Sequence, residues 1–338
     1  MQLSVIISTY NRKKILEETL KHILGGNTLF VRDEMEIIIV NDGEDNLEDL
    51  SEQYTSFHFR IVKNKGRGLA AGRNTGASLA KGEVLLFYDD DIIPTKEHFI
   101  RHLSVHKKFE RAICMAYRIY PNELIKIAEQ EIFGRYKLKY EYDCMKGMNL
   151  TLFEDDIYLS DGAAGYSCSI KRETYLDVGP FNETFEYAGC EDSEFFHRAK
   201  KKGYKLLFDK KNLCYHNELD NFELKRWLWR QSTGIKSAVV MCKLHPEGKA
   251  HPTWYTNTPL QWADPFDVKI LKIKKWLLSR KLVEKILFGL VWFLEKIKAP
   301  DKILFRLYNA LWLGNTYRSF REAYKRLFSS EQRPLPPL

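Results

Sequence analysis

The fold is decided by one stretch, Leu85-Leu86-Phe87-Tyr88-Asp89-Asp90-Asp91-Ile92-Ile93-Pro94. An apolar run typical of a buried strand leads directly into three carboxylates, and Pro94 ends the extended segment. Because adjacent acids repel one another, solvent or a cation must lie among them. Side chains alternate along a strand, so we expect Asp89 and Asp91 on one side and Asp90 on the other. Two oxygen ligands on one side suit Mg²⁺ or Mn²⁺; taken alone, the three acids are equally typical of a solvated turn.

Strands and helices alternate before and after this stretch. Strands are predicted over 3–7, 36–40, 57–62 and 113–119, and helices over 15–24, 70–80 and 97–109. This alternation predicts an α/β fold with a mostly parallel sheet. Polar residues follow three of the strands, at Ser8 to Asn11, at Asn41-Asp42 and at Asp89 to Asp91. Since ligands bind at the carboxyl ends of parallel strands, these segments predict one binding site.

The second half of the chain predicts a helical extension. We expect strands over 162–170, 206–208 and 213–215, and helices over 123–135, from Glu191, and over 222–244, 268–298, 302–313 and 317–328. Gly314 separates the last two helices, and a proline-bearing connector covers 246–265. We therefore expect three parts, namely a catalytic domain over 1–220, a helix and connector over 221–265 that complete the acceptor side, and a basic helical extension over 266–338.

The positive charge is concentrated in that extension. The 338 residues include 53 Lys and Arg and 45 Asp and Glu, a net charge of +8. Residues 266–326 hold 15 basic and five acidic residues, a net charge of +10, so the rest of the chain carries −2. Lysines opposite apolar faces are typical of helices that lie on an anionic membrane surface, but also of helices that pack on the catalytic body or form a homodimer. No nucleic-acid motif is present, so we expect no nucleic-acid partner.

Cysteine usage and the chain start indicate the compartment. The six cysteines show no CxxC or zinc-ligand spacing, and Met1 leads directly into a predicted strand. No apolar run has the length of a membrane span. We expect a cytoplasmic protein, either free or held peripherally on the inner face of the membrane.

Five segments, in this order, resemble family 2 glycosyltransferases of the GT-A fold over roughly residues 3–217. They are Val5 to Arg12, Val40 to Gly43, Gly72 to Glu83, Asp89 to Asp91, and a block from Gly179 to Asp192 that is similar to the acceptor-side motif of galactosyltransferase-like relatives. The resemblance implies a nucleotide-diphospho-sugar transferase fold with a mostly parallel, Rossmann-like sheet and a C-terminal α-helical extension. It also implies inverting transfer from a nucleotide-sugar, with UDP as the favoured nucleotide.

The resemblance assigns the donor and metal residues. Asp89 and Asp91 form the DxD pair and His216 is the third metal ligand, a mixture of oxygen and imidazole that favours Mn²⁺ over Mg²⁺. The expected donor-binding residues are Thr9, Tyr10, Asn11, Asp42, Arg73, Asp89 and Asp90. Among them Asp42 would bind a uracil-type ring, and Arg73 would face the pyrophosphate or hold Asp42. Taken alone, Asn41-Asp42-Gly43 is also a plain turn signal, and a histidine after a strand is often structural.

Inversion by direct displacement needs a base for the acceptor hydroxyl. By resemblance Asp192 is this base and Glu191 supports it; both acids also match the dipole at a helix start. The Q-x-x-R-W signature of processive relatives is absent, so we expect transfer of a single sugar to a glycan or lipid-linked acceptor in polysaccharide biosynthesis. A non-catalytic sugar-nucleotide-binding scaffold is the alternative. No GxGxxG follows the first strand, which disfavours a dehydrogenase.

Overall fold

The computed structural model describes residues 1–25, 28–29, 32–55, 57–162, 164–185, 188–218, 222–247 and 252–328. It divides into two compact units. The first unit comprises Met1–Ile125 and Tyr142–Glu218, and the second comprises Lys126–Glu141 and Leu219–Leu338. The predicted boundaries at 220 and 265 stay predictions, and the last ten residues of the expected extension lie outside the described residues.

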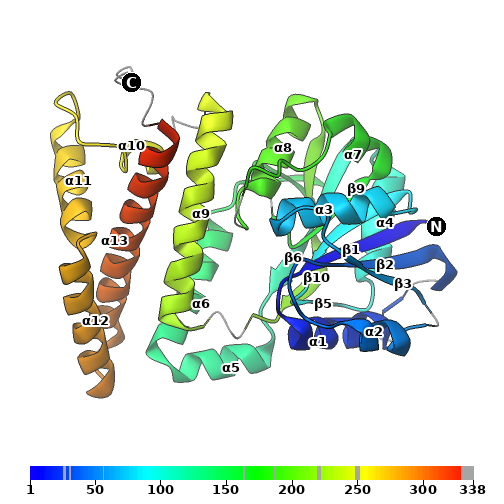
Figure 1. Ribbon diagram of the computed structural model, residues 1–338, viewed down its shortest axis with the longest axis horizontal. Coiled ribbons are helices and arrows are strands. Elements are labelled where there is room, and N and C mark those ends of the chain that lie inside the picture. The colour runs from blue at the N-terminus through cyan, green and yellow to red at the C-terminus, as the bar shows by residue number, and fades with distance from the viewer. Residues whose placement is uncertain are drawn as a thin grey trace. The chain divides into compact units, whose positions relative to one another are not determined.

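One sheet forms the first unit, in the order β3-β2-β1-β4-β9-β6-β10-β8-β7, with β5 paired to β10 (Figure 1). Its strands are β1 Leu3–Thr9, β2 Met35–Asn41, β3 His58–Lys63, β4 Val84–Asp89, β5 Ile92–Pro94, β6 Ala112–Ile119, β7 Leu150–Glu154, β8 Ile157–Ser160, β9 Ser167–Lys171 and β10 Lys205–His216. β3, β2, β1 and β4 are parallel, but β9 lies antiparallel between β4 and β6. The predicted α/β fold is confirmed, while the sheet is mixed because reversed strands enter after β4.

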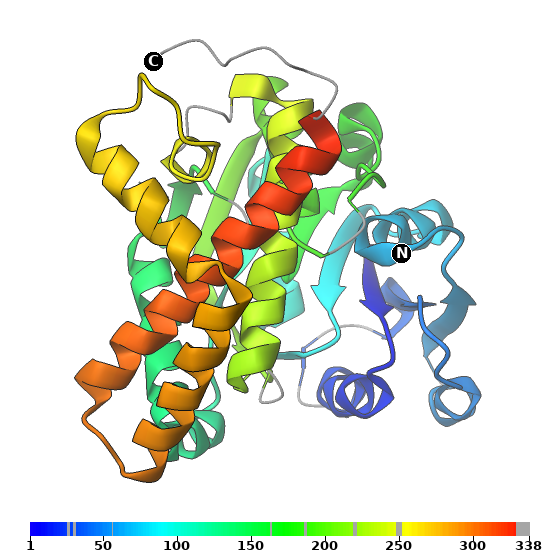
Figure 2. The same cartoon turned by 60° about the vertical axis from the view of Figure 1, so that its left-hand side comes forward.

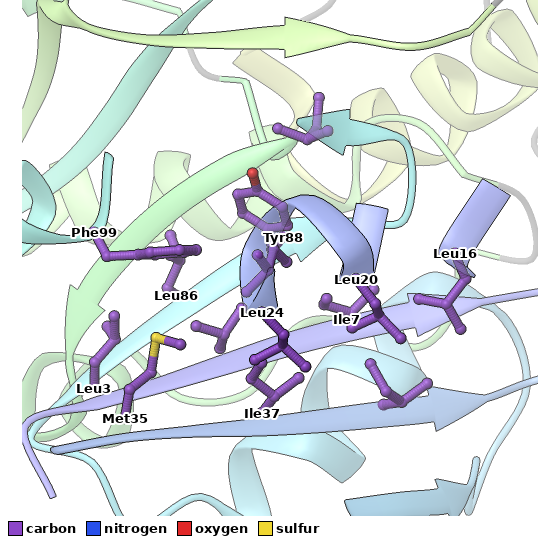
Figure 3. Close-up of a cluster of buried hydrophobic side chains, with 14 of the residues drawn as sticks. Leu3, Ile7, Leu16, Leu20, Leu24, Met35, Ile37, Leu86, Tyr88 and Phe99 are labelled. Atoms are coloured by element: carbon purple, nitrogen blue, oxygen red, sulfur yellow. The ribbon is translucent and has the colours of Figure 1, made fainter. Parts of the chain in front are cut away.

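Helices cover both faces of this sheet (Figure 1). They are α1 Lys13–Leu24, α2 Glu48–Gln53, α3 Gly68–Leu79, α4 His98–Lys108, α7 Arg172–Val178 and α8 Glu191–Lys201, with α5 Asn122–Gln130 and α6 Ile132–Lys146 leading into and out of the second unit. The apolar residues of α1 recur at helical spacing, so Leu16, Leu20 and Leu24 face Ile7 and Ile37 of the sheet (Figure 3). This packing fixes the carboxyl ends of β1, β2 and β4 at one edge.

Two short strands predicted over 206–208 and 213–215 are in fact one strand, β10. The polar run between them suggested a break, but it is an irregularity in the ladder between Asp209 and Leu213. Asp209 is fully buried, and its Oδ1 accepts hydrogen bonds from the backbone of Lys211 and Asn212. Arg101 neutralises it at 2.8 Å. A buried, paired carboxylate therefore replaces the ladder bonds, and the strand continues to His216.

The second unit contains α9 Leu224–Leu244, α10 Pro252–Tyr255, α11 Phe266–Leu278, α12 Lys281–Lys296 and α13 Asp301–Phe328, with α13 packed along α9, α11 and α12 (Figure 2). Gly314 does not end a helix as predicted. A Cβ at Gly314 would lie 2.4 Å from the carbonyl oxygen of Leu278, so glycine lets α13 pass close to the end of α11. The predicted single helix over 268–298 breaks at that crossing, where Arg318 donates to the Ser279 carbonyl at 3.2 Å. Among the described residues, no helix is apolar for long enough to span a bilayer.

Three histidines of α4 form a buried polar cluster under β9. His98 Nε2 lies 2.9 Å from Ser167 Oγ, and His106 Nε2 lies 2.8 Å from Ser169 Oγ. His102 contacts both serine hydroxyls, at 3.1 and 2.8 Å. Burial lowers the pKa of His98 and of His106 to about 4, and burial together with the neighbouring histidines holds the pKa of His102 well below its ordinary value. The cluster is therefore neutral in the folded protein at neutral pH.

The contribution of this histidine cluster to stability should fall as the pH drops from 6.5 towards 4. A histidine has a pKa near 6.5 in the unfolded chain and near 4 in this cluster. Between these pH values the unfolded state therefore binds more protons than the folded state. The stability that the neutral histidines contribute above pH 6.5 is lost across this window. At pH 5.0 the loss is about 2 kcal/mol each for His98 and His106. Urea unfolding at pH 7.5 and 5.0 measures it. On going from pH 7.5 to 5.0, the change in stability should be about 2 kcal/mol more favourable in His106→Gln than in the parent. His22→Gln, on the partly exposed face of α1, should behave as the parent does, and equal changes in both variants would contradict the assignment.

Candidate active site

The three consecutive acids lie where β4 turns into β5. β4 ends at Asp89, and Asp90 and Asp91 form the turn, each less than 5% exposed. Arg12 holds both of them, with Nη1 2.6 Å from Asp90 Oδ1 and Nη2 2.9 Å from Asp91 Oδ2. The expected strand-like alternation of these acids is wrong because the chain leaves the strand at Asp89. Arg12 supplies the counter-charge that lets two adjacent carboxylates be buried.

Asp90 is bonded to the protein on every side. Its Oδ2 accepts a hydrogen bond from Thr9 Oγ1 at 2.8 Å, and its carbonyl oxygen accepts one from Thr19 Oγ1 at 2.7 Å. Burial raises the pKa of Asp90 to about 7, against the opposing effect of Arg12. Thr9 and Asp90 were predicted to contact the donor; the structure shows them bonded to each other and buried. They anchor the turn that presents Asp91.

Asp91 and His216 present two ligand atoms side by side. Asp91 Oδ1 is buried, accepts no hydrogen bond, and lies 3.3 Å from His216 Nε2. The pair is held by the β5–β10 ladder and by the bond from the Asn217 amide to the Asp91 carbonyl at 2.8 Å. Although burial acts in the other direction, His216 and Arg12 lower the pKa of Asp91. Neighbouring ligands of an octahedral ion with bonds of about 2.1 Å are roughly 3 Å apart, so this pair fits a divalent cation.

Arg73 of α3 joins the end of β4 to the start of α8. Its side chain is buried; Nη1 donates to Glu191 Oε1 at 2.8 Å, and Nη2 donates to Asp89 Oδ1 at 3.3 Å and to the Gly165 carbonyl at 3.1 Å. Burial and the neighbouring Asp192 raise the pKa of Glu191 to about 7, against the effect of Arg73. The expectation that Arg73 could hold Asp42 is wrong. Instead it ties the DxD segment to the acidic pair that follows Cys190.

Asp192 is the second residue of α8 and is half-buried. Its Oδ2 accepts a hydrogen bond from the Gly165 amide at 2.9 Å, and its Oδ1 accepts one from the Ser193 amide at 2.6 Å. Gly165 therefore contacts both Asp192 and Arg73. Cys190 precedes the helix with φ of +68°, a left-handed conformation that is uncommon for a residue with a side chain. The carboxylate is thus oriented by two backbone amides and by a sharply turned helix start.

The predicted base-binding residues meet at the ends of β1 and β2. Asp42 donates its amide to the Thr9 carbonyl at 2.9 Å, and its two carboxylate oxygens accept from Asn64 Nδ2 at 2.7 Å and from the Gly68 amide at 2.9 Å. Asn11 accepts from the Glu44 amide at 2.8 Å. Tyr10 is 62% exposed, so its ring can stack on a planar ligand. The structure brings these residues together at one edge.

Sequence reasoning assigned no role to Arg12, Thr19 or Gly165. Arg12 ends the segment Val5 to Arg12. It could have been predicted as a partner of the three adjacent acids, because they need a counter-charge. Gly165 and Thr19 act through backbone groups or through a single hydroxyl, and no residue pattern marks such contacts.

Comparisons with known proteins identify the family of the chain. The family model "Glycosyl transferase family 2" matches residues 4–174, half of the chain. The chain is 28% identical over 261 residues to the uncharacterized glycosyltransferase YfnE of Bacillus subtilis, covering 64% of this chain and 65% of that one. It is 26% identical over 240 residues to the chondroitin synthase of Pasteurella multocida, covering 64% of this chain but 25% of the synthase. The chain thus spans less than two thirds of these relatives.

Solved structures share the fold. The mannosyltransferase PcManGT of Pyrobaculum calidifontis, in complex with GDP-Man and Mn²⁺, superposes with a TM-score of 0.57 at 16% identity, covering 95% of this chain and 88% of that one. GalNAc-T7 with UDP, GalNAc and Mn²⁺ gives a TM-score of 0.57 at 17% identity, covering 84% and 57%. The sheet with its helical extension is therefore that of GT-A enzymes. On the family match and this fold, the chain belongs to glycosyl transferase family 2, a family of inverting glycosyltransferases.

Proposed function

We propose that this chain transfers a single sugar from a nucleotide-diphosphate sugar, with UDP as the expected nucleotide, to a hydroxyl group of a glycan or lipid-linked acceptor. One observation carries the proposal. The buried Oδ1 of Asp91 lies 3.3 Å from His216 Nε2, a separation that fits two ligands of one divalent cation. Structural relatives hold nucleotide-sugars or their products with Mn²⁺, which supports the same ion class here.

Asp89, Asp91 and His216 would hold the cation, with Mn²⁺ favoured over Mg²⁺ by the imidazole ligand. When bound there, such an ion supplies Lewis-acid stabilisation of the departing diphosphate. The chain itself orients the donor. Asp42, fixed by Asn64 and the Gly68 amide, is suited to accept a hydrogen bond from the base, and the exposed ring of Tyr10 is suited to stack on it.

Asp192 would take the proton of the attacking hydroxyl at one of its carboxylate oxygens. Both oxygens are positioned by backbone amides, which leaves their remaining lone pairs for an acceptor. Glu191 is buried and paired with Arg73, so it would act as a positioning residue by holding Arg73 between Asp89 and the start of α8. The geometry supports an inverting displacement with a single carboxylate base.

The alternative is a scaffold that binds sugar nucleotides without reaction. A panel of UDP-, GDP- and dTDP-sugars with and without Mn²⁺, scored by thermal shift and by release of nucleoside diphosphate, separates the two. We expect one donor class to stabilise the protein only with Mn²⁺ and to be turned over. Stabilisation without turnover in the presence of any hydroxyl acceptor would favour the scaffold, and no stabilisation by any donor, with or without Mn²⁺, would reject both.

We also propose that the second unit binds peripherally to an anionic membrane surface. Large apolar side chains on α11 and α12 are exposed to solvent: Phe266, Ile270, Ile273, Trp276, Leu277, Leu282, Ile286, Leu290, Trp292 and Phe293. Basic residues of these helices and of the link between them lie among the apolar residues in the sequence, including Lys269, Lys274, Arg280, Lys281 and Lys285. Exposed aromatic and aliphatic residues with interspersed cations favour a headgroup–acyl boundary carrying negative charge.

Vesicle sedimentation tests this surface. The chain should bind vesicles that contain an anionic phospholipid and should lose at least about tenfold in affinity when Leu282 and Trp292, both more than 60% exposed, are replaced by glutamate. Leu176→Glu is the matched control, because Leu176 is 70% exposed on α7 of the other unit. Unchanged binding in the double variant would reject the surface, and a doubled mass in solution that the double variant abolishes would assign it to a homodimer.

A further inference from the structure

The second unit contains a cavity of about 400 Å³ that the transferase chemistry does not use. Residues of α9, α11 and α13 and of the segment around α10 line it. Its polar lining consists of Arg230, Gln231, Thr253, Thr256, Asn257, Lys275 and Thr316. Two of these side chains are cationic, and none of the lining residues that the structure describes is acidic. The size is that of a small-ligand site, and the charge selects an anion.

Lys275 is the unusual residue of this cavity. It is 7% exposed, and its Nζ donates to Thr256 Oγ1 at 2.8 Å, to Asn257 Oδ1 at 3.0 Å and to the Thr256 carbonyl at 3.4 Å, all of them uncharged oxygens. Lys272, one turn earlier and 1% exposed, has a carboxylate partner in Asp264 at 2.8 Å. Burial and the charge of Lys272 lower the pKa of Lys275 to about 8. A buried ammonium without a carboxylate is costly, and a bound anion would remove that cost.

Gly234 keeps one wall of the cavity open. It lies in the middle of α9, where glycine is less favourable than alanine by roughly 1 kcal/mol. Neither usual reason for a helical glycine applies, because its φ is not positive and a Cβ built on it would meet no heavy atom within 4 Å. A larger side chain at this position would project into space that is free in the structure. The glycine therefore preserves volume in the cavity.

We propose that this cavity binds a phosphate ester, with the oxyanion at Lys275 and Arg230 and with hydroxyl groups of the ester at Gln231, Asn257 and the threonines. Trp312 offers an apolar ring to the carbon face of such a ligand. Charge-assisted hydrogen bonds from lysine and arginine are the strong interactions of phosphate sites. The ester is either a soluble phosphate, such as a sugar or glycerol phosphate, or the headgroup of a phospholipid. This inference does not depend on glycosyl transfer.

Isothermal titration calorimetry tests the site. The full chain is titrated with sn-glycerol 3-phosphate at constant ionic strength. We expect saturable binding, and a Kd that rises at least about tenfold in Lys275→Met and in Gly234→Leu. Gly234→Leu keeps both cations and replaces a poor helix former, so it reports on the cavity even where Lys275→Met disturbs folding. Lys274→Met, which removes an exposed cation from the same helix, is the matched control and should stay within twofold of the parent.

A second experiment, with phosphatidate vesicles, distinguishes a soluble phosphate ester from a phospholipid headgroup. Binding of glycerol phosphate that vesicles do not improve assigns a soluble ester. Tighter binding of phosphatidate vesicles, weakened by Gly234→Leu and competed by glycerol phosphate, assigns a headgroup. The inference is overturned if neither ligand binds at millimolar concentration, or if Lys274→Met weakens binding as much as Gly234→Leu does.

Discussion

Asp91→Asn should abolish Mn²⁺ binding and lower kcat by at least about 10³-fold. Asparagine keeps the shape of the side chain but removes the charge that faces His216 Nε2 at 3.3 Å. Its amide group also replaces one of two oxygens, and Arg12 already takes the other. Mn²⁺ affinity, followed by electron paramagnetic resonance of the free ion, measures the loss without any turnover, and product release from the preferred donor measures the effect on rate.

Asp90→Asn is the control for the metal-site prediction, since it removes the same charge from the adjacent residue. Asp90 is bonded to Arg12 and Thr9, so the affinity of the variant for Mn²⁺ should change only a few-fold. Equal loss of Mn²⁺ affinity in both variants would mean that the turn as a whole, and not Asp91, defines the site. Retained Mn²⁺ affinity in Asp91→Asn would remove Asp91 from the set of ligands.

Asp192→Asn should leave the affinity for the nucleotide unchanged and lower kcat by about 10²–10⁴-fold. An amide cannot take the proton of the acceptor hydroxyl, whereas Arg73, Asp89 and Asp91 remain in place to hold the donor. The split between affinity and rate is the informative part, because a loss of folding would lower both. Titration with the nucleoside diphosphate in the presence of Mn²⁺ and single-turnover transfer give the two quantities.

Ser193→Ala tests whether orientation alone explains that effect. Ser193 Oγ lies 3.3 Å from Asp192 Oδ1, so its removal perturbs the carboxylate without changing its chemistry. The expected reduction in rate is less than about tenfold, because the Ser193 amide still holds the same oxygen at 2.6 Å. Undiminished turnover in Asp192→Asn would assign the base to another group.

A further variant, Glu191→Gln, tests whether the acidic segment at Asp89 and the acidic segment at Glu191 are coupled. Asp89 and Glu191 are 102 positions apart in the sequence, yet Arg73 contacts both. A change at Glu191 should therefore act on the DxD end through Arg73. If the segments are coupled, Glu191→Gln should lower both the affinity for Mn²⁺ and the rate of transfer. Without coupling, it should leave the affinity for Mn²⁺ unchanged.

Much of the first unit was predictable because its signals are local. Continuous apolar runs in β1, β2 and β4 and helical spacing in α1 placed these strands and this helix, and polar residues after β1, β2 and β4 predicted the edge at which they meet. Predictions failed where a polar run or a glycine had a tertiary role. Asp209 is satisfied within β10 by backbone amides and Arg101, and Gly314 serves a helix crossing. Neither partner is near in sequence, so no local pattern could distinguish these roles from a break.

By itself, the sequence determined the α/β class, the family and the residues that carry charge at the strand ends. Periodicity and residue chemistry are properties of the chain that do not depend on distant contacts. Only the tertiary structure decided which carboxylate is left for a ligand. In the fold, Asp90 is bonded to Thr9 and Arg12, and Glu191 is paired with Arg73. Asp91 Oδ1 lies beside His216. Adjacent acids with the same chemistry differ only in the partners that folding brings to them, and those partners set burial, charge and availability.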